Sequence, residues 1–386
     1  MAWVRKVCSL MFIGLLGLSA CGPGRQPDVA SLKIGVVGPF EGELAALGAS
    51  MRDGVLLATE QWNAAGGLLG QPIELVVKDS ACDYQRGRAA AQEAIDEGVA
   101  FIIGALCADA SEGVAQVVSQ AGVLQITPGS VNLDLTLDAE GEVRPLVFRM
   151  PFVDNDQGTV AARFALNDLG ATTAGMLYAE ESVYGSALSG AFQAAFEAGG
   201  GDVVAVETYD QDSLLFYEEL EEMREANPDV LYFPGYHDVA NRLVTQARSF
   251  GLLQPVLGSD GWDSPDLDIA AARSLYLTTH FFAAEPRTQV RTWVDAFEAR
   301  FQRVPDALAA LSYDAADLLF SAIDETGLAD PAFVAETLMT IEFDGVTGPC
   351  TFDAVHNPIK PVTVLRFEGG QFLFEGRFSP ADGEEP

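Results

Sequence analysis

Apolar positions in the first part of the chain follow two spacings, one typical of buried strands and one typical of helices. Short β-branched runs bounded by glycine or polar residues predict strands, whereas Met51, Val55 and Trp62 recur at helical spacing before Gly66 ends the pattern. The expected elements of this first series are 32–38, 51–65, 73–78, 88–95, 99–103, 111–120 and 123–126. Strands and helices that alternate in this way predict βαβ units and a parallel sheet covered by helices.

A second series with the same alternation begins after Asp154. We expect strands at 175–178, 203–206, 230–233 and 256–257, and helices at 186–196 and 239–250. The pattern then becomes mostly helical, at 289–301, 308–323 and 333–339, and closes with a glycine-turn hairpin over 362–374. The two series together predict two α/β lobes packed across a cleft.

The first residues carry the features of an export signal. Arg5 and Lys6 precede an apolar stretch, 7–18, that is too short to span a bilayer as a permanent helix. Small residues then lead to Cys21, a pattern that resembles a bacterial lipobox, in which this cysteine becomes the lipidated first residue of the mature protein. An ordinary signal peptide with an incidental cysteine is the alternative. We therefore expect a lipoprotein signal peptide over 1–20 and a lipidated tether over 21–31. The protein would lie in the periplasm, anchored by its lipid to either the inner or the outer membrane.

The chain is strongly acidic, with 22 Lys and Arg residues against 56 Asp and Glu residues and a net charge of −34. A field of this sign repels nucleic acids, so we expect no nucleic-acid partner. The acidity has two interpretations, general solubility or a cleft that selects cationic ligands, and composition leaves both open.

Two cysteines lie just beyond expected strands of the first series, Cys82 after 73–77 and Cys107 after 99–103. Loops beyond the strand ends form the ligand crevice of an open parallel sheet, and an exported chain resides where disulfides persist. A disulfide between these two cysteines would stiffen one wall of a cleft and contribute about 3–4 kcal/mol to stability. Cys350 is then left over, and we expect it to be a buried small hydrophobe.

Motifs of enzymes are missing from the sequence. His237, His280 and His356 are far apart and lack the spacing of metal ligands, so we expect no metal and no cofactor. Neither a Gly-x-Ser-x-Gly elbow nor a phosphate-binding loop occurs in the chain. These observations favour a binding protein over an enzyme.

A series of short motifs, taken in order, resembles one known family. The motifs lie at 32–38, 63–70, 79–83, 103–107, 126–128, 156–158, 184–185, 235–237, 345–349 and 352–353. In order and spacing they resemble the leucine/isoleucine/valine-binding proteins, which are type I periplasmic solute-binding components of ABC importers. The resemblance covers nearly all of 32–378.

The resemblance implies a fold and a mechanism. The fold is α/β, with two doubly wound parallel-sheet lobes joined by three crossovers near 149–152, 272–275 and 345–351. We expect lobe 1 to comprise 32–150 plus 275–346, and lobe 2 to comprise 151–274 plus 347–382. The lobes would close on a small-molecule ligand by hinge motion, and a monomer would present the closed form to ABC permease subunits.

The family holds the carboxylate of an amino acid with hydroxyls and backbone amides of the first lobe. The positions that carry these hydroxyls are Ala108 and Val131 in this chain, and both are apolar. Gly129 belongs to the same loop, Ser130 or Ser111 could substitute, and amides at a helix N-terminus remain available to an anion. The change places the free α-carboxylate of the ligand in doubt.

In the second lobe the resemblance assigns Asp260 to the ligand's ammonium group, and Tyr184 and Tyr236 to the aromatic cover of the ligand. Packing at strand ends is the alternative for both tyrosines. Phe40 and Trp262 could add apolar walls. Asp109 could add a second negative charge, although we favour a helix-capping role for it.

The combined interpretation is an extracytoplasmic solute-binding lipoprotein of an ABC importer, which captures a small amino acid or a related amine or amide. Two alternatives remain: the same fold with a non-amino-acid ligand, or a ligand sensor for a signalling partner.

Overall fold

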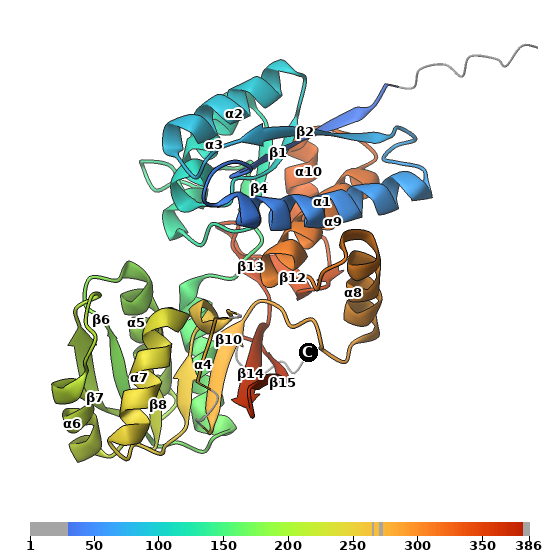
Figure 1. Ribbon diagram of the computed structural model, residues 1–386. Coiled ribbons are helices and arrows are strands. Elements are labelled where there is room, and N and C mark those ends of the chain that lie inside the picture. The colour runs from blue at the N-terminus through green and yellow to red at the C-terminus, as the bar shows by residue number, and fades with distance from the viewer. Residues whose placement is uncertain (1–29, 265, 270–272, 381–386) are drawn as a thin grey trace, which may run out of the picture.

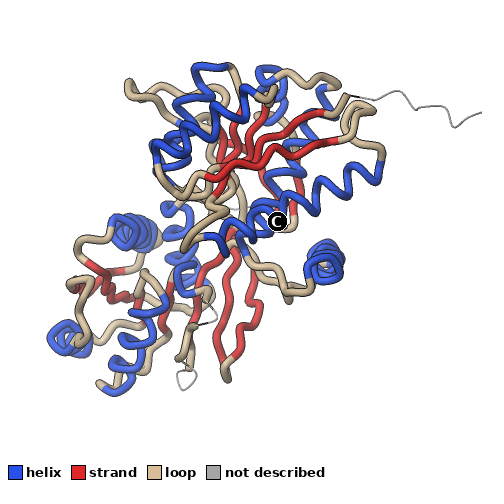
Figure 2. Tube along the Cα trace, turned by 45° about the horizontal axis from the view of Figure 1, so that its top comes forward, coloured by secondary structure: helices blue, strands red, loops and turns tan. Residues whose placement is uncertain are grey.

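The computed structural model describes residues 30–264, 266–269 and 273–380, which form two lobes placed side by side (Figure 1). Figure 2 shows the strands as two separate groups with helices beside each. The predicted signal peptide, the lipidation at Cys21 and most of the tether lie outside the described residues. No helix in the described part of the chain is long and apolar enough to cross a membrane.

Lobe 1 is built on a parallel five-stranded sheet with the order β2-β1-β3-β4-β5. Its strands are β1 (Leu32–Gly38), β2 (Ile73–Asp79), β3 (Phe101–Gly104), β4 (Leu124–Thr127) and β5 (Val147–Arg149). Its helices are α1 (Ala45–Ala65), α2 (Tyr84–Asp96), α3 (Ala108–Ala121), α8 (Thr288–Phe301), α9 (Ala307–Thr326) and α10 (Pro331–Leu338). Helices α1, α9 and α10 bury one apolar face of the sheet and α2 and α3 bury the other, as the alternation in the sequence predicts.

Lobe 2 has a seven-stranded sheet with the order β15-β14-β10-β9-β8-β6-β7. Its strands are β6 (Thr173–Ala179), β7 (Asp202–Tyr209), β8 (Val230–Tyr232), β9 (Val256–Gly258), β10 (Leu275–Thr279), β14 (Val362–Glu368) and β15 (Gln371–Phe378). Helices α4 (Asp154–Asn167) and α5 (Val183–Ala198) cover one face, and α6 (Tyr217–Ala226) and α7 (His237–Ser249) cover the other. The predicted hairpin is confirmed: β14 and β15 pair antiparallel, and the turn between them places Gly369 and Gly370 at positive φ (62° and 83°).

The first crossover, between β5 and α4, lies where the sequence predicts it. The predicted boundary at 274/275 is wrong, because β10 pairs in parallel with β9 and therefore belongs to lobe 2. The chain returns to lobe 1 only after Thr279. β10 forms a strand of the lobe 2 sheet because its apolar side chains, among them Leu275 and Leu277, pack into the core of lobe 2.

The third crossover also lies further along the chain than predicted. A small sheet of β11 (Phe343–Gly345), β12 (Gly348–Phe352) and β13 (Pro358–Ile359) precedes it. Cys350 and Phe352 on β12 pack into the core of lobe 1, whereas Val362 packs into the core of lobe 2. Lobe 2 therefore resumes after β13 rather than at residue 347.

The cysteines have the predicted arrangement. A disulfide joins Cys82 to Cys107, whose Cα atoms are 5.2 Å apart, so the loops after β2 and β3 are linked. Cys350 is a free, buried cysteine, and burial raises the pKa of its thiol to about 11. It packs as a small apolar side chain, as expected.

Candidate functional site

Asp260 stands at the centre of a polar cluster at the carboxyl end of the lobe 2 sheet. It opens a short 3-10 helix, η2 (Asp260–Trp262), directly after β9. Its Oδ1 accepts hydrogen bonds from the Tyr184 hydroxyl and from Gln157 Nε2 at 2.9 Å, and its Oδ2 lies 3.6 Å from His280 Nε2. The side chain is still 29% exposed. Side chains from α4, from α5 and from the residue that follows β10 thus hold a carboxylate that solvent can reach.

The charges around Asp260 make this end of lobe 2 negative. Burial raises the pKa of the carboxyl, but the bonds from His280, Tyr184 and Gln157 outweigh burial and lower the pKa below its ordinary value. Burial lowers the pKa of His280, an effect that the nearby carboxylate only partly offsets. The imidazole is therefore neutral near pH 7, while Asp260 is ionised and not neutralised by its neighbours.

A second carboxyl lies close to this cluster. Asp154 is the first residue of α4 and precedes Gln157 by three positions, so the two share one helix face. Burial, and then the charge of Asp260, raise the pKa of Asp154 to about 7, although Arg149 opposes the shift. The Arg149 guanidinium is 0% exposed and donates weakly to the carbonyls of Ser130 and Leu133, at 3.5 and 3.3 Å.

Two tyrosines form an aromatic surface beside Asp260. The rings of Tyr184 and Tyr236 are stacked with their centroids 5.3 Å apart. Tyr236 is 53% exposed and borders a small pocket of 60 Å³ that Ser182 and Tyr209 also line. The Tyr236 ring is therefore accessible to solvent beside Asp260, and its contact with a ligand stays a prediction.

Trp262 is not available to a ligand, contrary to the prediction. Its side chain is 1% exposed and packs in the core under α7. The indole lies directly on Gly258, where an added Cβ would come within 2.2 Å of the ring. Trp262 therefore supports the turn that carries Asp260 from the buried side.

The wall of lobe 1 is poor in exposed hydroxyls. Ala108, the first residue of α3, is exposed and Val131 is half-buried. Ser111 is 0% exposed and its hydroxyl is 3.4 Å from Thr127 Oγ1, while Ser130 is 2% exposed. Neither serine presents its hydroxyl to a ligand, so the predicted substitution for the missing donors does not occur in this conformation.

Two backbone amides of the loop after β4 are already hydrogen-bonded within the protein. Thr127 Oγ1 accepts hydrogen bonds from the amides of Gly129 and Ser130, at 3.3 and 3.1 Å. Asp109 is exposed in the first turn of α3, and within the described chain this helix has Cys107 as its N-cap, with no side-chain capping bond. The favoured capping role of Asp109 is therefore wrong, and its charge remains at the helix N-terminus. Phe40 is half-buried after β1, and its amide donates to Asp79 Oδ1 at 2.7 Å.

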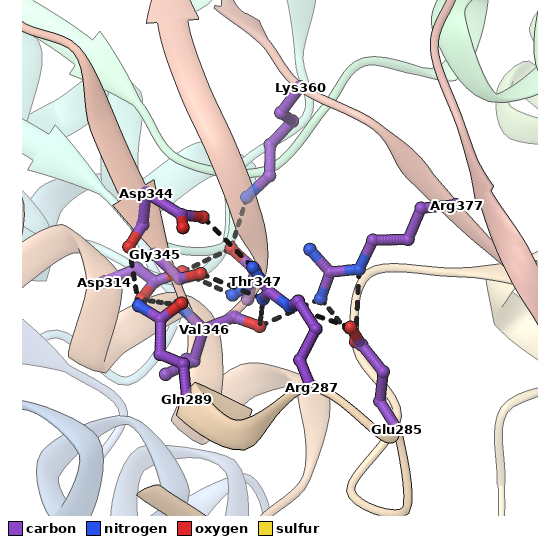
Figure 3. Close-up of polar contacts among 10 residues, drawn as sticks. All are labelled: Glu285, Arg287, Gln289, Asp314, Asp344, Gly345, Val346, Thr347, Lys360 and Arg377. Atoms are coloured by element: carbon purple, nitrogen blue, oxygen red, sulfur yellow. Dashed lines mark hydrogen bonds and ion pairs between the residues drawn. The ribbon is translucent and has the colours of Figure 1, made fainter. Parts of the chain in front are cut away.

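The crossovers contain a second polar cluster, drawn in Figure 3. Asp314 of α9 is 0% exposed and accepts hydrogen bonds from the amides of Val346 and Thr347, both at 2.8 Å, and from the Thr347 hydroxyl. Lys360, 2% exposed, donates to Thr347 Oγ1 at 2.5 Å and lies 3.4 Å from the carbonyl of Met150. The first and third crossovers are thus joined to α9.

The second crossover enters the same network through Glu285 and Arg287 (Figure 3). Glu285 is 1% exposed and accepts from Arg287 Nε at 2.8 Å and from Arg377 of β15. Both arginines donate to the carbonyl of Val346, at 2.9 and 3.0 Å. We call these residues, together with Asp314, Thr347 and Lys360, the crossover cluster.

The structure brings together Asp260, Tyr184 and Tyr236, as the sequence predicts. Sequence reasoning missed Gln157, His280 and Asp154. The first and last of these could have been found, because Gln157 lies within the 156–158 motif that carries the resemblance and Asp154 precedes that motif by two residues. His280 follows the end of β10, and assigning that strand to lobe 2 would have pointed to it. Among the described residues, no group of three His, Cys, Asp or Glu side chains could hold a metal ion.

Comparisons with known proteins agree with this architecture. Residues 31–371 match the family model described as periplasmic binding protein. The Leu-, Ile-, Val-, Thr- and Ala-binding protein of Pseudomonas aeruginosa is 30% identical over 325 residues, which are 84% of this chain and 86% of that protein. The Leu/Ile/Val-binding protein of Escherichia coli K12 is 28% identical over 344 residues, 88% of this chain and 91% of that protein.

Solved structures give the same result. The leucine-binding protein LivK of Thermotoga maritima is 31% identical with a TM-score of 0.73, covering 90% of this chain and 99% of that one. The substrate-binding protein LivJ of Streptococcus pneumoniae, in complex with isoleucine, is 27% identical with a TM-score of 0.73, covering 91% and 99%.

Proposed function

Because the chain belongs to the periplasmic binding protein family, whose members bind solutes and are not enzymes, we propose that it is the solute-binding component of an ABC importer. Its ligand is a small amino acid or a related amine or amide. The relatives named above support this assignment, since their names describe amino-acid binding.

The observation that carries the proposal is the Asp260 cluster. An ionised carboxylate that is fixed by three side chains, yet 29% exposed, is suited to pair with an ammonium group. The Tyr184 and Tyr236 rings beside it offer aromatic faces to the cation or to an apolar side chain of the ligand.

In the proposed mechanism, the ligand binds to lobe 2 and the lobes then close on it by movement about the crossovers. The closed form is the state that the permease subunits of the importer recognise. The protein acts as a monomer, and lipidation of Cys21 anchors it to a membrane of the periplasm. Replacement of Cys21 by serine would release the protein from membranes, which fractionation of cells labelled with a radioactive fatty acid would detect.

The function is tested by a thermal-shift screen of amino acids, amines and amides. A ligand present at 100 times its Kd stabilises the folded protein by about 2.7 kcal/mol, which is a readily measured shift. Asp260→Asn, which we expect to weaken binding about 30-fold, should reduce the stabilisation at the same ligand concentration to about 0.9 kcal/mol. Asp202→Asn should retain the full shift, because Asp202 is exposed at the opposite end of the sheet, where β7 begins. Turnover of a bound compound, or no response to any of these classes, would contradict the proposal.

A further inference from the structure

Resting on the proposed function, we infer that the ligand is an organic amine without a free carboxylate. The geometry behind this inference is an asymmetry between the two walls. Lobe 2 presents two carboxyl groups from adjoining elements, and the facing loops of lobe 1 present apolar side chains where a carboxylate would need donors.

The lobe 2 side supplies more negative charge than a zwitterionic amino acid requires. Asp260 and Asp154 approach each other because Gln157, on the same face of α4 as Asp154, donates to Asp260 Oδ1 at 2.9 Å. An α-amino acid carries one positive and one negative group, so its carboxylate would be repelled by a wall with two acids. An amine carries the positive group alone, so it is attracted by both carboxyl groups and has no anion for them to repel.

The lobe 1 side offers an anion little compensation. Ala108 and Val131 lack donors, and the amides of Gly129 and Ser130 are bound to Thr127 Oγ1. The N-terminus of α3 has free amides, which favour anions. The exposed carboxylate of Asp109 in its first turn, however, opposes a second negative charge there.

Two arginines near these loops are unavailable to a ligand, one because it is buried and one because it is paired. Arg149 lies under the loop after β4 and is 0% exposed, so its guanidinium does not reach the surface. Arg86, in the first turn of α2, is paired with Asp79. A ligand carboxylate would therefore meet no exposed hydroxyl donor at these positions, and neither of the two arginines is accessible to it without breaking a pair or opening the loop.

The test uses matched compounds that share one carbon skeleton. Leucine, leucinamide, 3-methylbutylamine and 4-methylpentanoate differ only in the carboxylate and the ammonium, and the alanine and phenylalanine sets repeat the comparison with other side chains. Isothermal titration of the full-length mature protein should give amine and amide affinities at least tenfold above that of the parent amino acid.

Each result has a defined meaning. If an amino acid binds as tightly as its amine, the inference is wrong and the proposed function stands. If only the carboxylates bind, or if no member of the three sets binds, both are wrong. The first outcome is thereby separated from failure of the function itself.

A gain-of-function variant tests the lobe 1 wall independently. Ala108→Ser combined with Val131→Thr restores two hydroxyls, and should shift the ratio of amino-acid to amine affinity towards the amino acid by tenfold or more. Ala108→Gly combined with Val131→Ala, which adds no donor, is the matched control and should leave that ratio within twofold. An equal ratio in both double variants would overturn the argument that missing donors exclude the carboxylate.

Discussion

Two carboxylates, Asp314 and Asp260, illustrate how the same chemical group serves different ends in this molecule. Asp314 is 0% exposed, and its two carboxylate oxygens accept hydrogen bonds from the backbone amides of Val346 and Thr347, which are adjacent in one turn. Asp260 is bonded by side chains from three separate elements and keeps 29% of its side chain exposed. A carboxylate satisfied by one turn fixes that turn, whereas one that several elements hold in an accessible position keeps its charge for a partner.

The largest expected effect is on the first of these groups. Asp314→Ala removes the acceptor for two buried amides and leaves Lys360 buried without its nearby negative charge. We expect the free energy of unfolding to fall by about 3–5 kcal/mol, measured by urea denaturation.

Asp202→Ala, at an exposed strand end, is the control and should change stability by less than about 0.5 kcal/mol. A loss below about 1 kcal/mol for Asp314→Ala would mean that the crossover cluster is not a determinant of stability.

The disulfide tests the rigidity of the lobe 1 wall. Replacing both Cys82 and Cys107 by serine should lower the free energy of unfolding by about 3–4 kcal/mol, because the unfolded chain regains the entropy of a loop of 25 residues. Thermal unfolding with and without reductant gives the same comparison in the native sequence. Cys350→Ser keeps the disulfide and should respond to reductant as the native protein does. The double variant should not respond, and a shift as large in it under reductant would show that another bond is involved.

Asp260→Asn should affect ligand binding rather than stability, the opposite of what we expect for Asp314→Ala. We expect ligand affinity to fall about 30-fold, or about 2 kcal/mol, because an amide of the same shape cannot pair with an ammonium group. The free energy of unfolding should change little, since Asn still accepts from Gln157 and Tyr184. Calorimetry and denaturation on one preparation separate the two effects. A variant that binds normally would remove Asp260 from the site.

These contrasts show what the sequence could predict. Alternating strand and helix patterns were sufficient for the α/β lobes, and the hairpin was recognisable from its two glycines because the turn needs positive φ. The run Leu275–Thr279 was assigned to the wrong lobe, because its place depends on pairing with β9, which no local pattern encodes. That error also concealed His280 at the end of the strand.

The site was predictable only in part for a similar reason. Asp260, Tyr184 and Tyr236 follow strand ends, and sequence position and resemblance were enough to select them. Whether an aromatic ring faces solvent or the core is decided by tertiary packing, as Trp262 on Gly258 demonstrates. The role of Gln157 likewise depends on how α4 meets β9 and β10 in space, through its bonds to Asp260 and Thr278.

The smallest expected effect concerns pH. The pKa of Asp154 is raised to about 7, whereas the lowered pKa values of Asp260 and His280 keep the first ionised and the second neutral near this pH. A cationic ligand favours the ionised form of Asp154, so binding below pH 7 must release its proton. Affinity for an amine should therefore rise about tenfold from pH 6 to pH 8 and then level off.

Two variants assign this pH dependence. Asp154→Asn should flatten the profile between pH 6 and pH 8. Asp156→Asn should not, although burial and Asp353 raise the pKa of Asp156 to about 6, because the group that perturbs it is Asp353 rather than Asp260. In the ligand-free protein, the free energy of unfolding changes with pH in the opposite direction to ligand affinity. Because the pKa of Asp154 is raised in the folded state, stability should fall as pH rises from about 4 to 7, and Asp154→Asn should abolish that loss. If Asp154→Asn leaves the dependence of affinity on pH unchanged, the titrating group lies elsewhere. The contrast between an accessible carboxylate site that binds a cation and the buried crossover cluster would then be weaker.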